Sequence, residues 1–214
     1  MVWPGSMTIY LPPLDLEKKL WAANKLIVAG IDEAGRGAIA GPIVAAMVIL
    51  PAFKESDQIL NGVKDSKLMT SLQRMKWAEI IKDHALFWSI GILEPSEIDN
   101  LGIQIANQMA MSKAIQQYPG SIDHHLFDFI FWKQCPFEGQ RIKRGESASL
   151  SIAAASVIAK TTRDELMISL SSKYPDYDWN KNKGYGTKSH ITAIKNYGFC
   201  PHHRRSFILK EYCQ

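Results

Sequence analysis

Residues 26–37 read LIVAGIDEAGRG, an apolar run that ends in two adjacent carboxylates and a glycine-rich turn. The apolar part is typical of a buried strand, and Asp32 and Glu33 stand at its end. Because side chains alternate between the faces of a strand, the two acids converge only if the chain bends directly after Asp32. Two carboxylates in a partly dry cleft need a balancing charge, which a divalent cation, an arginine or a shared proton can supply.

The length of 214 residues suits one main domain with a C-terminal extension. The longest apolar run, residues 43–53, is too short to cross a bilayer, and no secretory signal is visible, so we expect a cytoplasmic protein without a membrane partner. Three cysteines without CxxC spacing argue against a disulfide framework. Cys200-Pro201-His202-His203 lacks the second ligand pair of a zinc site and is better explained by ordinary packing.

The net charge of +4 is distributed unevenly along the chain. From residue 180 onward there are seven Lys or Arg and one acid, a net charge of +6, while the preceding part has a net charge of −2. A basic tail on a slightly acidic body predicts a polyanionic partner, although a solvated basic surface is the simpler alternative.

The order of the remaining elements predicts a mixed α/β sheet flanked by helices, with a small helical C-terminal extension. We expect an N-terminal extension over residues 1–25, one catalytic domain over 26–180 and a basic helical segment over 181–214. Strands are predicted at 26–32 and 43–50, forming an antiparallel pair, and at 85–93 and 126–131; helices are predicted at 71–83, 96–118, 147–172 and 187–197.

Asp128 lies within the short strand 126–131, where both faces are otherwise apolar. An ionised carboxylate there is costly without a partner, so a metal-ligand or ion-pair role is favoured. An edge strand with Asp128 facing water is the alternative.

Asp164 shares a mostly apolar helix face with Val157, Met167 and Ile168. A surface pair with Lys160 or Arg163 explains it equally well. If Asp32, Glu33, Asp128 and Asp164 converge on one cleft, four carboxylates favour Mg²⁺ or Mn²⁺ over zinc.

Three further segments suit a phosphodiester substrate. Gly35, Arg36 and Gly37 offer backbone donors and a guanidinium, Asp65-Ser66-Lys67 places an amine beside a turn, and residues 183–187 hold Tyr185 on a basic loop. Each also has a structural explanation, since glycines form turns, Asp-Ser caps helices and a tyrosine can cover core.

Together these motifs resemble bacterial ribonuclease HII. The matching segments, in the family's order, are 32–37 with 40–42, 65–67, 152–160 leading into 163–164, 174–175, 183–187 with His190, and 203–204 with 206–207. The combination is far more specific than any single segment. Two positions depart from the family pattern: Phe129 stands where many members carry glycine, and Glu146 where many carry aspartate.

The resemblance implies a ribonuclease H fold and hydrolysis of the RNA strand of RNA–DNA hybrids, with incision 5′ of single ribonucleotides in duplex DNA. Two Mg²⁺ or Mn²⁺ ions would support it, leaving 3′-OH and 5′-phosphate ends. The family pattern makes Asp32, Glu33, Asp128 and Asp164 the metal-binding catalytic acids, and Gly35, Arg36, Gly37, Lys67, Tyr185 and Arg204 the substrate-binding residues.

Two alternatives stay open at this point. A ribonuclease HIII-like enzyme is one, although the related pattern lacks the arginine of the Gly35-Arg36-Gly37 loop. A non-catalytic nucleic-acid binding module is the other, and it explains the basic tail but not the acids on apolar strands. We expect a monomer, and the sequence identifies no protein partner.

Overall fold

The computed structural model describes residues 11–53, 56–128 and 130–207. Its centre is a five-stranded sheet in the order β3-β2-β1-β4-β5. β1 pairs antiparallel with β2, and β2 with β3, while β1–β4 and β4–β5 are parallel. The predicted mixed α/β class is therefore confirmed. The strands are β1 (Val28–Ala34), β2 (Ile43–Ile49), β3 (Phe87–Leu93), β4 (His124–Asp128) and β5 (Gly139–Ile142).

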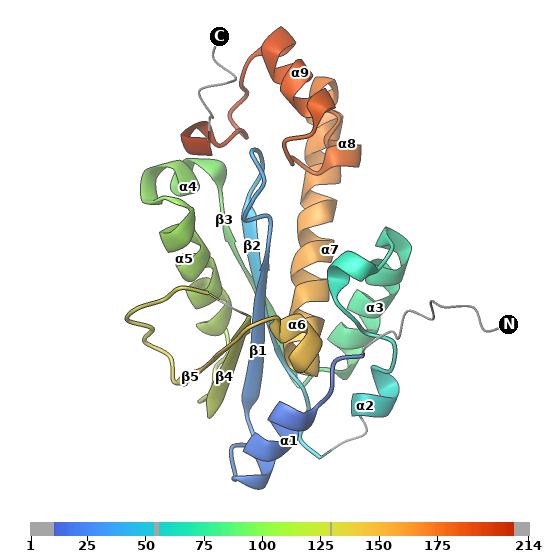
Figure 1. The fold of residues 1–214 in the computed structure, drawn as a ribbon, viewed down its shortest axis with the longest axis vertical. Coiled ribbons are helices and arrows are strands. Elements are labelled where there is room, and N and C mark those ends of the chain that lie inside the picture. The colour runs from blue at the N-terminus through green and yellow to red at the C-terminus, as the bar shows by residue number, and fades with distance from the viewer. Residues whose placement is uncertain (1–10, 54–55, 129, 208–214) are drawn as a thin grey trace, which may run out of the picture.

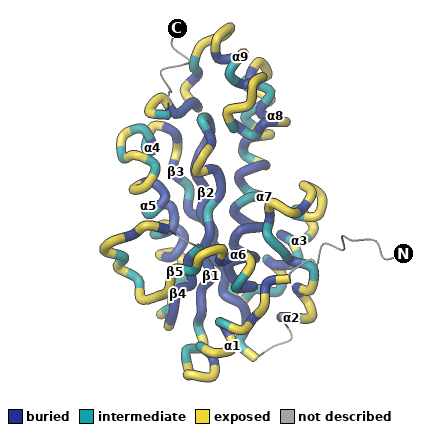
Figure 2. Tube along the Cα trace, viewed as in Figure 1, coloured by how far each residue is buried: buried dark blue, intermediate teal, exposed yellow. Residues whose placement is uncertain are grey.

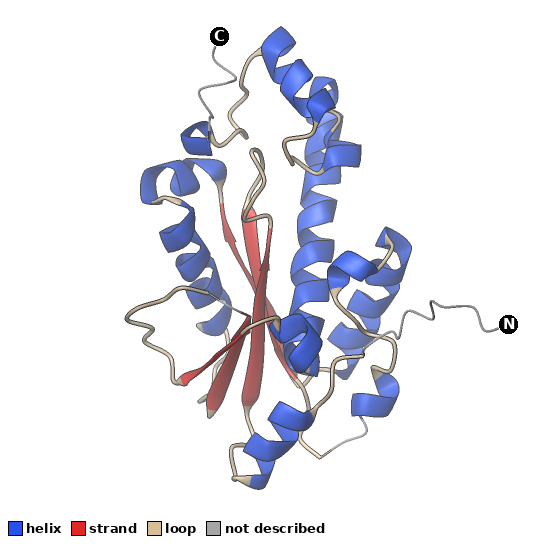
Figure 3. Cartoon of the chain, viewed as in Figure 1, coloured by secondary structure: helices blue, strands red, loops and turns tan. Residues whose placement is uncertain are grey.

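Helices cover both faces of the sheet (Figures 1 and 3). On one face lie α1 (Asp15–Ala22), α3 (Ser71–His84) and α7 (Leu150–Lys173); on the other lie α4 (Pro95–Leu101) and α5 (Ile103–Ile115). The short elements are α2 (Ser56–Ile59), η1 (Ser66–Leu68), α6 (Gly145–Ala148), η2 (Pro175–Tyr177), α8 (Trp179–Asn182), α9 (Lys188–Tyr197) and η3 (Arg205–Phe207). Within the described ranges, no helix is long and apolar enough to cross a membrane.

Helix α7 packs directly on β1 because the contact is built from small residues. Ala153, Ala154 and Ala155 are fully buried. A Cβ at Gly30 would lie only 2.2 Å from the carbonyl carbon of Ser151, so only glycine permits this approach. Figure 2 shows the sheet and this helix as the buried centre of the molecule.

The predicted elements agree with the structure in outline: β5 was not predicted, β4 lies at His124–Asp128 where a strand was expected over 126–131, and three further differences concern the helices and β1. The helix expected over 96–118 is two helices, because Gly102 breaks it with φ +76°. The helix expected from residue 147 begins after Ser149, whose hydroxyl accepts from the Ile152 N–H. The third difference concerns β1, which continues through Ala34 in register with β2, so the chain does not bend after Asp32.

The N-terminal segment 11–25 packs against the sheet domain. Leu14 and Trp21 join the core beneath α7, and the buried Glu17 accepts hydrogen bonds from the hydroxyls of Ser149 at 2.5 Å and Ser151 at 2.6 Å. A carboxylate at the start of α7 also suits the positive end of the helix dipole. Residues 1–10 of the predicted extension lie outside the described residues, as do Phe129 and residues 208–214 of the basic tail.

Candidate active site

A cleft of about 230 Å³ opens at the end of β1 and β4. Eight of the ten residues predicted for the site line it: Asp32, Glu33, Gly35, Arg36, Gly37, Lys67, Asp128 and Tyr185. Ser66, Ser156 and Lys160 also line it. Segments that are far apart in the sequence thus meet at one place, as the motif order implies.

Three carboxylates gather on the α7 side of the sheet. Asp32, Asp128 and Glu146 each offer an oxygen, and these atoms lie within 4.8 Å of one another. Asp32 lies near the end of β1 on the face that carries Val28, and Asp128 ends β4 on the face that carries Leu126. Glu146 comes from α6, whose Gly145 N–H donates to Asp128 Oδ1 at 2.7 Å. We call these three residues the acidic cluster.

The electrostatics of the acidic cluster call for a cation. Burial raises the pKa of Asp32 well above its usual range, and the charges of Glu33 and Asp128 raise it further. Burial also raises the pKa of Glu146 to about 7, against the opposing effect of Lys67. Oxygen-only ligands that repel one another in this way fit a hard divalent cation such as Mg²⁺ or Mn²⁺.

Glu33 faces the opposite side of β1 from Asp32, because the strand stays regular. Burial raises the pKa of Glu33, while hydrogen bonding by Asn107 of α5 and the charge of Arg36 lower it. Glu33 therefore lines the cleft without joining the acidic cluster. The bend expected directly after Asp32 is therefore absent, although both acids line the same cleft and the charge of Glu33 raises the pKa of Asp32.

Lys67 and Ser156 connect the acidic cluster to its surroundings. Lys67 Nζ donates to Glu146 Oε1 at 2.7 Å, and the Ser156 hydroxyl lies 2.9 Å from that of Ser66. Asp65 accepts from the Lys67 N–H at 2.8 Å and so caps η1. The turn expected to present an amine is present, with the side chain of Lys67 71% exposed.

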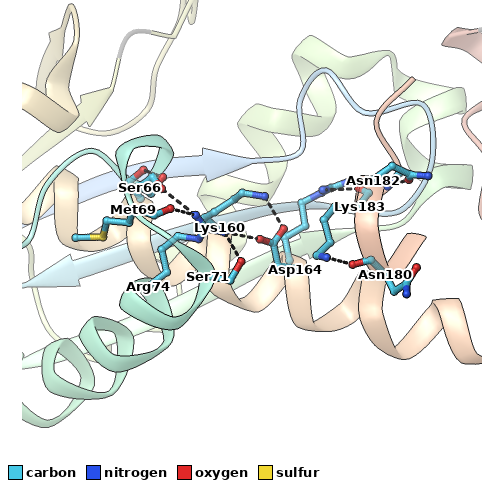
Figure 4. Close-up of polar contacts among 12 residues, drawn as sticks. Ser66, Met69, Ser71, Arg74, Lys160, Asp164, Asn180, Asn182 and Lys183 are labelled. Atoms are coloured by element: carbon cyan, nitrogen blue, oxygen red, sulfur yellow. Dashed lines mark hydrogen bonds and ion pairs between the residues drawn. The ribbon is translucent and has the colours of Figure 1, made fainter. Parts of the chain in front are cut away.

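Asp164 does not join the acidic cluster, which corrects the prediction of four converging acids. Its Oδ2 accepts from Arg74 Nη2 at 3.0 Å and its Oδ1 from Lys160 Nζ at 2.5 Å (Figure 4). Arg74 also donates to the carbonyls of Ser66 at 3.1 Å and Met69 at 2.6 Å. Both oxygens of Asp164 are thus bound by cationic side chains. The ion pair with Lys160 named in the alternative is present, but Asp164 is buried and not at the surface.

Sequence reasoning missed Glu146 as a site residue. The resemblance marks position 146 only as one where many family members carry aspartate, yet an acid in place of another acid keeps the carboxylate. The physical signal was weaker, since residues 141–146 mix basic and acidic side chains without periodicity.

Arg204 is not available to a substrate, which corrects a second prediction. Its side chain is 1% exposed, and its guanidinium donates to the carbonyls of Gly35 at 2.8 Å, Arg36 at 3.2 Å, Gly41 at 2.9 Å and Pro42 at 3.0 Å. All its donors point at the loop that follows β1. Arg204 therefore holds the Gly35-Arg36-Gly37 loop from inside, while Arg36 itself is exposed.

Arg163 supports the same loop from α7 and connects it to Tyr185. The buried guanidinium donates to the carbonyls of Pro42 at 3.0 Å, Ala40 at 3.1 Å and Lys183 at 3.0 Å. It also lies 5.2 Å from the centre of the Tyr185 ring, a cation–π contact. We call Arg163 and Arg204 the arginine pair.

The segment carrying Tyr185 is attached to the loop by its main chain as well. The Gly184 carbonyl accepts from the N–H groups of Ile39 at 2.9 Å and Ala40 at 3.1 Å. Gly184 has φ +79°, and a Cβ there would lie 2.4 Å from the Ala40 oxygen. The half-buried Tyr185 ring is consequently held beside Lys160, whose Nζ lies 5.7 Å from the ring centre.

Comparison with known proteins agrees with this arrangement. The family model described as Ribonuclease HII matches residues 29–210. The chain belongs to the ribonuclease HII family. It is 45% identical over 194 residues to the ribonuclease HII of Caldanaerobacter subterraneus subsp. tengcongensis, covering 91% of this chain and 79% of the relative. It is 42% identical over 199 residues to that of Pelodictyon phaeoclathratiforme, covering 92% and 96%.

Solved structures give the same fold. The ribonuclease H2 of Pyrococcus horikoshii superposes with a TM-score of 0.69 at 25% identity, covering 84% of this chain and 92% of that one. The ribonuclease HII of Archaeoglobus fulgidus, solved in complex with PCNA, gives 0.73 at 21% identity, covering 87% and 97%. As a ribonuclease HII, this chain is a metal-dependent endoribonuclease acting on the RNA strand of RNA–DNA hybrids. Family membership excludes the alternative of a non-catalytic binding module.

Proposed function

We propose that this ribonuclease HII incises duplex DNA 5′ of single embedded ribonucleotides, in addition to cutting RNA–DNA hybrids. The observation that carries the proposal is that Asp32 and Asp128 of the acidic cluster line one cleft together with the Gly35-Arg36-Gly37 loop and Tyr185, while Glu146 lies next to these two acids. The residues proposed to recognise one 2′-OH therefore lie next to the residues proposed to hydrolyse the phosphodiester. The 2′-OH is the group that distinguishes RNA from DNA at a given position.

Asp32, Asp128 and Glu146 are the residues that would hold divalent cations, with Glu33 and Lys67 at the margin of the cleft. Two such ions would supply an activated water and stabilisation of the leaving 3′-oxygen, giving 3′-OH and 5′-phosphate products. Mg²⁺ and Mn²⁺ both suit carboxylate oxygens, and a related ribonuclease HIII with 18% identity and a TM-score of 0.64 was solved in complex with Mn²⁺.

The exposed Arg36 and the backbone of its loop would contact the ribonucleotide, and the Tyr185 ring would stack on the neighbouring sugar. Recognition of a sugar and its 2′-OH needs no base-specific contact, so cleavage is expected to be independent of base sequence. The exposed Lys67 amine offers a contact to phosphate.

The test is cleavage of a duplex with one ribonucleotide and of a long RNA–DNA hybrid, each with and without Mg²⁺. We expect incision 5′ of the ribonucleotide and a 3′-OH end. Robust hybrid cleavage with negligible incision at the lone ribonucleotide would contradict the proposal and favour ribonuclease HIII-like specificity.

Tyr185 variants test the reading step. Tyr185→Ala loses stacking, about 1–3 kcal/mol for an aromatic ring on a base and less on a sugar, together with register at the junction. Incision at a single ribonucleotide should fall more than hybrid cleavage, where neighbouring ribonucleotides allow other registers. Tyr185→Phe, which keeps the ring, is the control and should be milder. Equal losses on both substrates would assign Tyr185 a structural role.

A further inference from the structure

Two buried histidines lie against the segment that carries Tyr185. His190 of α9 is 0% exposed and His203 is 2% exposed, and their Nε2 atoms are 3.1 Å apart. His190 Nδ1 lies 3.0 Å from the carbonyl oxygen of Tyr185. Neither ring lines the cleft. His190 thus contacts the main chain of Tyr185, the proposed substrate-reading residue, and His203 contacts His190.

The partners of the two rings permit one assignment of protons. A carbonyl only accepts, so His190 Nδ1 carries a hydrogen and donates to Tyr185 O. His190 Nε2 then accepts, both from Trp179 Nε1–H at 3.0 Å and from His203. The remaining nitrogen, His203 Nδ1, accepts from the Cys200 N–H at 3.0 Å. The hydrogen bonds therefore run in one direction, from Cys200 through His203 and His190 to Tyr185.

This chain of hydrogen bonds holds only while both rings are neutral. A proton on His190 Nε2 would face two N–H donors, and one on His203 Nδ1 would face the Cys200 N–H. Tyr177, Cys200 and His202 are the ionisable neighbours that act on the pair. Burial lowers the pKa of His190 and, together with the charge of His190, lowers the pKa of His203 to about 4.

We propose that His190 and His203 are positioning residues for Tyr185, acting through this one-way chain of hydrogen bonds. The inference rests on the proposed role of Tyr185 in reading the ribonucleotide. The carbonyl of Tyr185 also accepts from the Thr187 N–H at 2.8 Å, so two donors fix the peptide behind the ring. Arg163 and Lys160 contact the ring itself. Without the hydrogen bond from His190, the Tyr185 ring would still contact Arg163 and Lys160, but the peptide of Tyr185 would be less constrained.

The first test compares His203→Phe with His203→Gln. Phenylalanine keeps an aromatic ring against Tyr177, whose centre is 4.6 Å from that of His203, but removes both nitrogens. Glutamine keeps an N–H near the position of Nε2. We expect His203→Phe to lower incision at a single ribonucleotide about tenfold more than hybrid cleavage, since small misplacements cost up to about 100-fold. His203→Gln should restore most of the difference.

The matched control is His84→Gln, which alters an imidazole that hydrogen-bonds Ser56 Oγ at 2.9 Å outside the cleft. It should leave the ratio of the two activities unchanged. A comparable change of ratio in His84→Gln, or equal losses on both substrates in His203→Phe, would overturn the positioning role.

The double variant His203→Phe/Tyr185→Ala separates this inference from the proposed function. If His203 acts through Tyr185, the double variant shows the same substrate ratio as Tyr185→Ala. An additional loss of ratio would overturn the inference. If Tyr185→Ala alone leaves the ratio unchanged, the proposed reading role of Tyr185 fails instead.

The wild-type protein offers a test that needs no variant. Long-range ¹H–¹⁵N correlation spectra of ¹⁵N-histidine-labelled enzyme distinguish the two neutral tautomers and the imidazolium. We expect His190 as the Nδ1–H tautomer and His203 as the Nε2–H tautomer, both still neutral at pH 6. The same tautomer at both positions, or a charged ring at pH 6, would overturn the assignment.

Discussion

The acidic cluster brings negative charges together, and the arginine pair brings positive charges together. The two groups differ in what surrounds them. Arg163 and Arg204 repel one another, but their seven hydrogen bonds all end on backbone carbonyls. Asp32, Asp128 and Glu146 have fewer donors, and burial raises the pKa values of two of them. Like charges that the chain satisfies itself stabilise the fold, whereas those it leaves unsatisfied are available to a ligand.

The same contrast explains Asp164 and Glu146, the two acids that sequence reasoning confused. Asp164 is bound by two cations on both oxygens. Glu146 shares its space with two other carboxylates and one exposed lysine.

The largest effect is expected for the acidic cluster. Asp32→Asn should reduce cleavage at least about 100-fold while hybrid binding stays within a few-fold, because a cation ligand is lost together with a charge that repels phosphate. Glu146→Gln should have the same kind of effect. Single-turnover cleavage and a binding titration measure the two quantities; Mg²⁺-dependent turnover above about a tenth of wild type would remove Asp32 from the site.

Arg204→Met should instead act on stability. It leaves four carbonyls of the loop without their donor, and the free energy of unfolding should fall by about 3 kcal/mol or more. Denaturant unfolding checks this value. Arg36→Met, on the exposed side of the same loop, is the matched control: stability should stay within about 0.5 kcal/mol while the salt dependence of duplex binding weakens. The reverse pattern would mean that Arg204, not Arg36, faces the substrate.

Asp164→Asn should give an intermediate result. Arg74 and Lys160 would lose their shared carboxylate at a largely buried position, lowering the free energy of unfolding by about 1–3 kcal/mol. Cleavage per folded molecule, measured well below the melting temperature, should remain within about tenfold of wild type. A loss as large as that of Glu146→Gln would restore Asp164 to the catalytic acids.

A smaller effect concerns pH in the absence of metal. The pKa of Glu146 is about 7 in the fold against 4.5 ordinarily, so the folded state holds a proton that the unfolded chain releases. Its contribution to stability therefore falls as pH rises from about 4.5 to 7. In Glu146→Gln this dependence should weaken, and thermal unfolding in EDTA at pH 5 and pH 8 measures the difference. Identical pH dependence in both proteins would contradict the raised pKa.

Local sequence signals predicted the fold well because the strands and helices of this chain coincide with runs and periodic spacings of apolar residues. The apolar run before Asp32 predicts a buried strand, and the small residues of α7 suit close packing of that helix on β1. Gly102 could have announced the break between α4 and α5, since glycine accepts a positive φ at little cost.

The burial of charged residues was less predictable because it depends on partners far away in the sequence. Arg204 looked like part of an exposed basic tail, yet its carbonyl acceptors lie more than 160 residues earlier. Of the apolar residues predicted to surround Asp164, Val157 and Met167 are buried and Ile168 is exposed, but Arg74, ninety residues away, decides the role of Asp164. Hydrophobic periodicity predicts the helix face on which a residue lies. It does not predict which charged residue, distant in the sequence, will bind that residue.

Helix α7 also sets the distance between the acidic cluster and the Gly35-Arg36-Gly37 loop. Ser156 faces the acidic cluster and Arg163 the loop, seven residues apart, which is about 10 Å of rise and two turns. One inserted residue between them would rotate Arg163 by about 100° away from its carbonyls. The number of residues between these two positions therefore matters more than most of the side chains along the helix, because an insertion or deletion there would change how the acidic cluster and the loop face one another.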